Sequence, residues 1–464
     1  MRILAVFSQR VHRTIKGVAA IAAAMALAAC SNVLDVDNPN NVVDDALNNP
    51  AATASIVNGA GASVIKAFNS VLAPYGTVTD ELVWSGSRDG FKQLDDGGVS
   101  DPFNEYVDAA TFNVSEARYL TDEAITRLLG FDKAGTLTSP NELARAYLYG
   151  SMIYVLIPDM FDDFVVKSYR TVAAAPEGES KMSGLYDVAI DYATKGLAKA
   201  STAAMRGDLT AMRARARHGK AVWLKVNPGL TAPAQPLVGD ADIVADANAA
   251  LAIVGAGTDY RLEMTPSPVG GTGNPGSGFE INQRAELAGG DYFFVRNAAG
   301  TKITDIALND PIANVKDPAL ITNADRYVRV TPFNGDGRYI PGTAVSTREL
   351  LLYVAEAALA NSNTAGFTTA INQLRALDGL TAYSGQIPAF DLLKHSRAVN
   401  LYMHGRRLAD MYRFGIKAVA APGKLNGGWA TTSEAYRRAG CFFSISVTER
   451  QANPLVTTQP SCRG

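Results

Sequence analysis

The sequence predicts a mainly α-helical fold with an irregular, partly β insertion. Three observations support this fold class. Apolar residues recur at helical spacing through residues 140–260 and again through 346–415. Capping signals stand at the start of both regions. Residues 261–345 lose the helical pattern and contain short β-like stretches. We find no clear linker, so a single domain is expected over residues 30–464, preceded by a separate segment at residues 1–29.

The first helical region has a well-marked beginning. Ser139 is expected at the N-cap, Pro140 at the first helical position, and Glu142 completes a capping box. Pro158 is expected to end this helix. Apolar spacing then predicts three further helices, at residues 183–199, 209–226 and 241–254.

The second region contains the strongest helical pair. Ser346 and Glu349 form another capping box, and apolar residues of 367–377 supply the facing stripe of a partner helix. The pair occupies residues 346–378, a length of 33 residues, close to the period of about 34 residues of a tetratricopeptide hairpin. We therefore expect tetratricopeptide-like helical hairpins, followed by one long helix over about residues 390–414.

The insertion at 261–345 differs in composition from the helical regions. Residues 266–278 hold five glycines and three prolines, and the stretch 291–295 has β-like character. Insertions on a repeat scaffold often carry the binding surface. The insertion is thus a candidate ligand-binding segment.

The N-terminal segment has the features of an export signal. Four basic residues and no acidic residue precede an apolar run at 17–29. This run is thirteen residues long and suits a signal-peptide core. The run ends in Leu27-Ala28-Ala29-Cys30, which resembles a bacterial lipobox. We expect cleavage before Cys30 and a lipid anchor on its thiol, since two acyl chains give stable membrane attachment. The alternative is an ordinary signal peptide in which the cysteine occurs by chance.

Charge and cysteine content limit the function further. Without the first thirty residues, 39 basic and 45 acidic residues remain, a formal charge of −6, which argues against a nucleic-acid partner. No second apolar run after Cys30 is long enough to cross a membrane. Cys441 and Cys462 are expected to form a disulfide in an exported protein. Two free thiols are the alternative.

Motifs for catalysis, metals or cofactors are missing from the sequence. The histidines show no metal-ligand spacing, and His218 and His395 are expected at the surface or at helix caps. The doublets Asp95-Asp96 and Asp162-Asp163 are candidate carboxylate pairs, but neighbouring side chains point in different directions, so solvated loop charge is the expected role. We therefore expect no catalytic residue, no metal and no cofactor other than the lipid on Cys30.

Several stretches together resemble the SusD/RagB family of outer-membrane lipoproteins. The segment 30–40 reads Cys-Ser-Asn-Val-Leu-Asp-Val-Asp-Asn-Pro-Asn, similar to the start of the mature family proteins. Residues 348–357, Arg-Glu-Leu-Leu-Leu-Tyr-Val-Ala-Glu-Ala, are similar to the family's Arg-x-x-Glu-x-Leu-Leu-x-x-Ala-Glu-Ala helix. The partner helix reads Asn-Gln-Leu-Arg-Ala-Leu at 372–377, where the family's second arginine is replaced by Leu377.

A further motif at residues 395–415 resembles the family pattern Glu-Arg-x-x-Glu-Leu-x-x-Glu-Gly-x-Arg-x-x-Asp-x-x-Arg-x-Gly. The three glutamates of that pattern are replaced here by Ser396, Asn400 and His404. Residues 441–454 resemble the closing Phe-Pro-Ile-Pro…Asn-Pro segment, with Ser444 and Ser446 in place of two prolines. The order and spacing of the motifs from 30 to 454 make the resemblance specific.

The resemblance implies a fold on tetratricopeptide-like pairs and a lipid-anchored location in the outer membrane, at the cell surface. It also implies a partner: a TonB-dependent outer-membrane barrel of the SusC type, over which the protein acts as a lid that captures glycans or other oligomers. Arg406, Asp410 and Arg413 are spaced so that they can form a ladder on one helix face. We expect them to be structural.

Ligand contacts are expected from aromatic faces and planar polar groups. One candidate cluster lies in an expected loop and comprises Tyr75, Asp80, Trp84, Arg88 and Asp89. The second lies in the insertion and comprises Tyr292, Phe293 and Phe294. Packing is the alternative role for each aromatic residue, and Trp223 is expected in the core. The ligand is expected to be an oligosaccharide or a peptide.

The leading functional hypothesis is non-enzymatic nutrient capture as the accessory subunit of a transporter. A tetratricopeptide-like lipoprotein scaffold that binds other envelope proteins is the alternative. A surface glycosidase is the third hypothesis, and it requires a carboxylate pair about 5–9.5 Å apart in a cleft.

Overall fold

The computed structural model describes residues 44–167, 172–227, 231–266, 279–281, 284–290, 312, 341–418, 428–459 and 462. The chain divides into two compact units, Met1–Asn49 and Pro50–Gly464. In the first unit the described part is a short 3-10 helix, Asp44–Asn48. Cys30 and the lipobox lie outside the described residues, so the lipid anchor remains a prediction.

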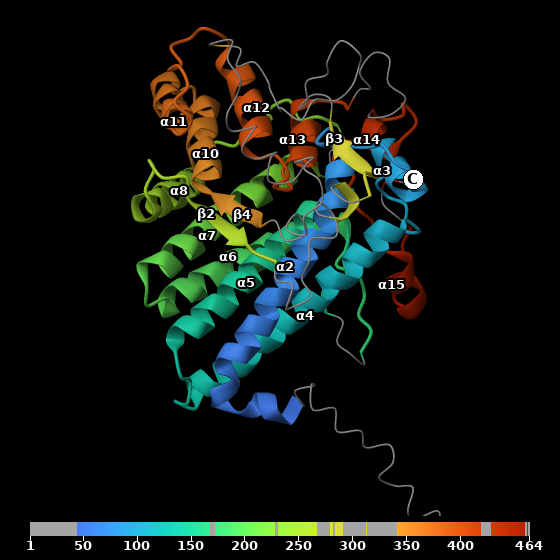
Figure 1. Cartoon of the computed structure of the whole chain (residues 1–464), viewed down its shortest axis with the longest axis vertical. Helices are drawn as coiled ribbons and strands as arrows, with labels where there is room; N and C mark the ends of the chain where they lie inside the picture. Colours follow the sequence, from blue (N-terminus) through green and yellow to red (C-terminus); the bar gives the residue numbers. More distant parts are fainter. Residues whose placement is uncertain are drawn as a thin grey trace, which may run out of the picture. The chain divides into compact units, whose positions relative to one another are not determined.

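The second unit is built on long antiparallel helices (Figure 1). α2 (Thr53–Val78) packs against α4 (Glu105–Lys133) and α5 (Pro140–Met160), while the short strand β1 (Leu82–Trp84) and helix α3 (Asp89–Asp95) connect α2 to α4. Buried alanines and valines of α2 allow this close packing; Val57, Ala60, Val64, Ala67 and Val71 are each 0–2% exposed. The sequence patterns did not locate α2 or α4.

Helical hairpins continue from this layer. α5 packs on α6 (Ser183–Lys199), α6 on α7 (Ala203–Val226), and α7 on α8 (Ala241–Val254). α8 then contacts α10 (Thr347–Ala360), which pairs with α11 (Thr364–Ala376). The bounds predicted for α6 and α8 agree with the structure, and α7 begins six residues earlier than predicted. The mainly helical fold with tetratricopeptide-like pairs is confirmed.

The helix starts follow the capping signals only in part. Ser346 caps α10, and its Oγ accepts a hydrogen bond from Glu349 N at 3.2 Å. Ser139 precedes α5, but its side chain makes no capping bond; its carbonyl accepts from Glu142 N instead. Pro158 lies inside α5 and does not end it, since the helix continues to Met160.

The long helix predicted over 390–414 is wrong. The structure contains two helices, α12 (Ala389–Asn400) and α13 (Arg407–Phe414), separated by a turn. Met403 and Gly405 adopt positive φ values of 57° and 73°, a conformation that no helix contains. Gly405 takes this conformation without strain because it lacks a Cβ atom.

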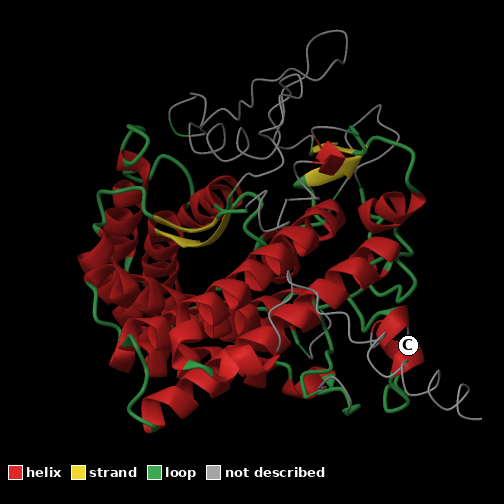
Figure 2. Ribbon diagram, turned by 60° about the horizontal axis from the view of Figure 1, so that its bottom comes forward, coloured by secondary structure: helices red, strands yellow, loops and turns green. Residues whose placement is uncertain are grey.

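The insertion joins the helices through two small antiparallel sheets (Figure 2). β2 (Arg261–Met264) pairs with β4 (Gly342–Ser346), which leads directly into α10. β3 (Leu287–Gly289) pairs with β1, far away in the sequence. The two ends of the insertion are therefore held together in one sheet, and its described middle part is held at a second place, on β1.

A network of buried charges connects α5, α7, α10, α12 and α13. It contains four arginines and four acids: Arg215, Arg397, Arg406, Arg413, Asp159, Glu349, Glu356 and Asp410. Glu356 accepts from Arg397 (3.3 Å) and Arg413 (3.1 Å), and these arginines also bind Asp410. A cavity of about 30 Å³ lies among these side chains, room for one or two water molecules. Because four positive charges face four negative charges, each buried ion has a partner of opposite charge that offsets part of its desolvation cost.

This network confirms that the arginines of the 395–415 motif are structural, but it corrects their arrangement. Arg406 precedes α13 and binds Glu349 of α10, with Nε 2.6 Å from Oε1, rather than Asp410. Asp410 pairs with Arg413 on the same helix and with Arg397 on α12. The turn at Gly405 removes Arg406 from the helix face on which the ladder was expected.

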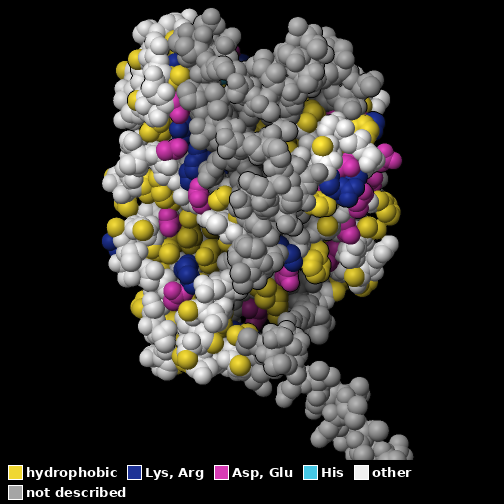
Figure 3. Space-filling view, viewed as in Figure 1, with side chains coloured by type: hydrophobic (Ala, Val, Ile, Leu, Met, Phe, Trp, Pro, Cys, Tyr) yellow, Lys and Arg dark blue, Asp and Glu magenta, His cyan; other side chains and the backbone are white. Residues whose placement is uncertain are grey.

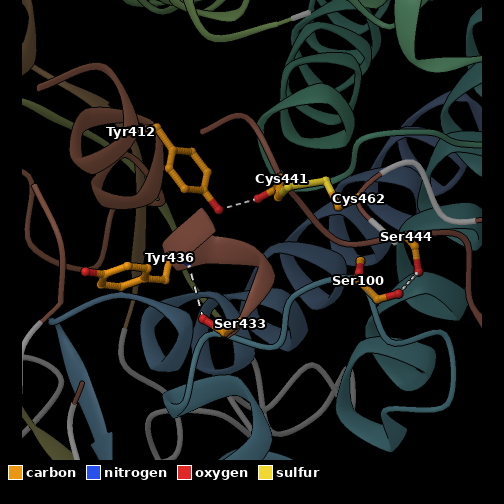
Figure 4. The surroundings of a disulfide bond; sticks show 7 residues. All are labelled: Ser100, Tyr412, Ser433, Tyr436, Cys441, Ser444 and Cys462. Atoms are coloured by element: carbon orange, nitrogen blue, oxygen red, sulfur yellow. Dashed lines mark hydrogen bonds between the residues drawn. A yellow bond between two sulfur atoms is a disulfide. The ribbon is translucent and has the colours of Figure 1, made fainter. Parts of the chain in front are cut away.

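The C-terminal segment packs back onto the helices and contains a disulfide between Cys441 and Cys462 (Figure 4). Their Cα atoms are 5.9 Å apart. Tyr412 of α13 donates its hydroxyl to Cys441 O at 2.6 Å, and Ser444 Oγ donates to Ser100 O at 3.0 Å. The short helices α14 (Glu434–Arg437) and α15 (Val447–Ala452) flank this region. The segment thus closes one end of the α2–α4–α5 layer.

One helix among the described residues, Pro50–Val78, is long and apolar enough to cross a membrane. The prediction that no run after Cys30 is long and apolar enough to cross a membrane is therefore wrong. In the structure, 61% of the helix's apolar window is buried inside the protein, as in a core helix. On the described parts of the face in Figure 3, basic and acidic side chains lie next to one another rather than in a separate basic region.

Candidate ligand-binding site

The best-supported candidate site surrounds Trp84, at the end of β1. β1 pairs with β3 in the register Leu82–Gly289, Val83–Ala288 and Trp84–Leu287. Leu82 and Leu287 are buried and fix the sheet to the core, while the Trp84 side chain is half-buried. At the other end of the pairing, a Cβ atom on Gly290 would collide with Asp80 O, so glycine is required for this close backbone approach.

The loop after β1 is held by one carboxylate from the insertion. Glu286 accepts hydrogen bonds from Ser87 N (2.6 Å), Ser87 Oγ (3.0 Å) and Arg88 N (3.0 Å). Burial alone would raise the pKa of Glu286, but these hydrogen bonds outweigh it and lower the pKa below its ordinary value. A Cβ atom on Gly86 would collide with this carboxylate. The ionised carboxylate of Glu286 therefore holds the loop after β1 in place.

Arg88 occupies the centre of the site. Its Nη1 atom donates to Glu280 Oε1 at 2.6 Å and to Tyr106 Oη at 3.2 Å. Tyr106, at the start of α4, stacks on Phe91 of α3 with ring centroids 3.7 Å apart. Arg88 is thus positioned by three segments at once: the insertion, α3 and α4.

Glu280 has unused hydrogen-bonding capacity. The residue is only 6% exposed, and its Oε2 atom has no hydrogen-bond partner among the described residues. Burial raises the pKa of Glu280, although Arg88 partly counteracts it. A buried carboxylate oxygen without a donor is costly, so this atom is a candidate for ligand contact.

Trp84 has a basic neighbour. Lys92 Nζ lies 6.0 Å from the ring centroid of Trp84 and also binds Asp96 Oδ2 at 2.5 Å. This distance is at the outer limit of a cation–π contact. Together, Trp84, Arg88, Lys92, Tyr106, Glu280 and Glu286 form the group that we call the Trp84 site.

The five residues of the first predicted cluster do not all lie in one site. Trp84 and Arg88 lie together in the Trp84 site, and Asp89 is exposed beside them as the first residue of α3. Tyr75 does not lie in a loop: it belongs to α2, is 1% exposed and contacts Phe443 edge-to-face. Asp80 forms two bonds with Arg407, from Nε to Oδ1 (2.7 Å) and from Nη2 to Oδ2 (2.6 Å), which attach the start of β1 to α13.

Other predicted residues lie elsewhere. Tyr292, Phe293 and Phe294 are outside the described residues, so their ligand role stays a prediction. Trp223 is 4% exposed and stacks on Phe442, which confirms its core position. The surface position expected for His218 is wrong, because it is 4% exposed, stacks on Tyr353 and binds Glu356 at 3.2 Å.

The aspartate doublets also differ from the expected solvated charge. Asp95 and Asp162 are 2% and 1% exposed, whereas Asp96 pairs with Lys92 and Asp163 accepts from Phe164 N and Gly178 N. The two members of each doublet therefore have different surroundings, as expected for adjacent side chains. Among the described residues, no group of three or more potential ligands could hold a metal ion.

The sequence patterns did not indicate Lys92, Tyr106, Glu280 or Glu286 as members of this site. The two glutamates are far away in the chain from their partners; Arg88 and Glu280, for instance, are 192 positions apart. No local pattern marks such a contact. The only available signal was the general expectation that the insertion contributes to binding.

Comparison with known proteins identifies the fold. No model of a protein family matches the sequence, and no curated protein matches it significantly. Solved structures do match. A SusD superfamily protein from Bacteroides thetaiotaomicron has a TM-score of 0.60 at 13% identity, covering 89% of this chain and 100% of the other. A SusD-like carbohydrate binding protein from Bacteroides vulgatus gives 0.56 at 12% identity, covering 88% and 97%.

A third similar structure is a putative sugar binding protein from Bacteroides vulgatus, with a TM-score of 0.58 at 11% identity and coverage of 89% and 98%. The helical hairpins and the inserted segment define a helical scaffold of the tetratricopeptide-containing class. Within that class, the chain has the SusD-like fold. This agrees with the fold that the sequence motifs imply.

Proposed function

We propose that this protein is a nutrient-binding lipoprotein that captures glycans at the surface of the outer membrane. The observation that carries this proposal is the extent of the SusD-like fold. The match spans 88–89% of this chain in the three structures described above, of which two are described as carbohydrate or sugar binding.

The Trp84 site supports a glycan as the ligand. An indole ring offers a flat apolar face for the C–H side of a sugar, and Arg88, Tyr106 and Glu280 place polar groups nearby. The described middle part of the insertion meets the loop after β1 at this site, through Glu280 and Glu286. A peptide is the second ligand class to test.

Membrane attachment and transport complete the proposal. Lipidation of Cys30 anchors the protein in the outer membrane, and the segment after Cys30 acts as a tether. A TonB-dependent barrel of the SusC type accepts the captured ligand, with this protein as its lid. The protein is non-enzymatic in this role and needs no cofactor beyond its lipid.

Co-purification from native membranes tests the proposal. A C-terminal tag is added, membranes are solubilised gently, and the bound proteins are identified by mass spectrometry. A stoichiometric TonB-dependent barrel is the expected result. A Cys30→Ser variant is the matched control, since it loses the lipid and should appear in the soluble fraction. Recovery of the wild type with soluble envelope proteins instead of a barrel would favour the scaffold hypothesis and contradict ours.

A further inference from the structure

We infer that the Trp84 site selects oligosaccharides that present hydroxyl or amino donors and rejects acidic ones that carry uronate or sulfate groups. This inference rests on the proposed glycan-binding function and specifies the ligand class of the same site. It follows from which hydrogen-bonding groups are already used and which remain available.

The Arg88 Nη1 atom, at the centre of the site, is already engaged by protein acceptors. Arg88 Nη1 contacts both Glu280 Oε1 (2.6 Å) and Tyr106 Oη (3.2 Å). Lys92 is similarly engaged by Asp96. An anionic ligand group would have to compete with these carboxylates for the same cations.

The site also contains a buried acceptor without a partner. Glu280 Oε2 has no hydrogen-bond partner among the described residues, and the residue that carries it is only 6% exposed. A carboxylate oxygen accepts hydrogen bonds and cannot donate them when ionised. A ligand hydroxyl or amine satisfies it, whereas a ligand carboxylate or sulfate would place oxygen against oxygen.

The balance of charge around Arg88 favours the same ligands. Glu280 and Glu286 contact Arg88, and Glu105 and Asp89 lie beside it, with the Glu105 carboxylate against Gly90. Against these four acids stand Arg88 and the exposed Arg284, which lies near Glu280. The Lys92–Asp96 pair is neutral. Among the described residues the site therefore has an excess of two negative charges, which repels anions at short range.

A panel of soluble polysaccharides tests the inference. The mature lipidated protein in detergent is titrated with neutral probes (starch, xylan, galactomannan), a cationic probe (chitosan) and acidic probes (polygalacturonate, alginate, chondroitin sulfate). Neutral or amino polysaccharides should bind at least about tenfold more tightly than any acidic probe. Tightest binding to an acidic probe would overturn the inference and leave the glycan-binding function standing. Failure to bind any probe would overturn both.

Two variants make the test specific to Glu280. Glu280→Gln removes the charge but keeps the size of the side chain, so the preference for neutral over acidic probes should shrink about tenfold. Glu116→Gln, on α4, is the control: Glu116 is half-exposed and pairs only with Lys66 in the described structure, so its loss should leave the preference unchanged. An unchanged preference in Glu280→Gln, in a variant that still binds glycan, would contradict the assignment.

Discussion

Arg397 and Asp410 form a buried ion pair, Nε to Oδ2 at 2.8 Å, that joins α12 to α13 across a turn. The two residues are thirteen positions apart and would lie far from each other on one straight helix. The turn at Met403 and Gly405 brings them together. The same turn places Arg413 against Glu356 of α10 and Arg407 against Asp80 at the start of β1. The 395–415 motif, which looks like one helix in sequence, therefore connects α10 of the helical hairpins to the start of β1, next to the Trp84 site.

Arg397→Met should destabilise the protein by about 3 kcal/mol, because removing one member of a buried ion network leaves the others incompletely compensated. Arg397 is 2% exposed and binds both Asp410 and Glu356. Urea denaturation measures the loss. Arg145→Met is the control, since Arg145 is partly exposed and pairs with Glu142, and it should cost less than about 1 kcal/mol. Equal losses in the two variants would contradict a central role for the network.

Glu81→Gln should stabilise the protein increasingly as the pH rises from 4.5 towards 8. Burial raises the pKa of Glu81 from 4.5 to about 8, although Met403 N donates to its carboxylate. The unfolded state therefore loses its proton first, and stability falls as the pH rises through this window. The cost is roughly 1.4 kcal/mol for each unit between the two pKa values. Melting temperatures of the two proteins should converge below pH 4.5; a constant difference would contradict the assignment.

His218→Gln should stabilise the protein relative to wild type as the pH falls, whereas Glu81→Gln does so as the pH rises. Burial lowers the pKa of His218 from 6.5 to about 4, although the bond to Glu356 partly opposes the shift. The unfolded state binds the proton first as the pH falls, so the neutral imidazole loses its contribution to stability between pH 6.5 and 4. Glutamine cannot titrate, yet it can still bond to Glu356. The stability of the variant relative to wild type should rise as the pH falls through this window, measured by urea denaturation at several pH values; parallel curves would refute it.

Loss of the disulfide should destabilise the C-terminal segment. Cys441 and Cys462 are 21 positions apart, and opening a loop of this size costs about 3 kcal/mol in the chain-entropy model. The double variant Cys441→Ala/Cys462→Ala avoids placing a new polar group at Cys441, which is 0% exposed. Urea denaturation of the oxidised wild type and the variant measures the difference. Reduction of the wild type should reproduce the effect, and an unchanged midpoint would show that the cross-link contributes nothing.

The helices whose packing follows local periodicity could be predicted from sequence. α6 and α8 have the expected bounds, since their buried residues recur at regular spacing, as Leu185, Ala189, Ala193 and Gly196 do in α6. α2 was not located, because its small residues are buried on nearly all sides in its second half and leave no polar face. The break before α13 was missed because Met403 adopts a positive φ that its residue type does not indicate.

The Trp84 site could be predicted only in part. Trp84, Arg88 and Asp89 are neighbours in sequence, and their residue types indicate ligand contact. The acids that complete the site come from the insertion, with Ser87 and Glu286 separated by 199 positions. Tyr75 was assigned to a loop because it stands near polar residues in the sequence. In the structure it is buried in α2, and this burial raises the pKa of its hydroxyl well above the ordinary value. Three-dimensional contacts between distant segments decide these roles, and a single sequence does not encode them in any local pattern.

Trp84→Ala should weaken glycan binding about tenfold or more while the protein stays folded. The half-buried indole lies at the edge of β1, where its loss removes an aromatic face from the site but leaves the buried Leu82 and Val83 in place. Phe112→Ala is the matched control, because Phe112 is an aromatic residue on α4 that is 63% exposed and lies outside the Trp84 site. Titration with the tightest-binding polysaccharide measures affinity, and circular dichroism checks the fold. If Trp84→Ala binds as tightly as Phe112→Ala, the ligand does not contact Trp84, and the insertion residues Tyr292, Phe293 and Phe294 become the next candidates.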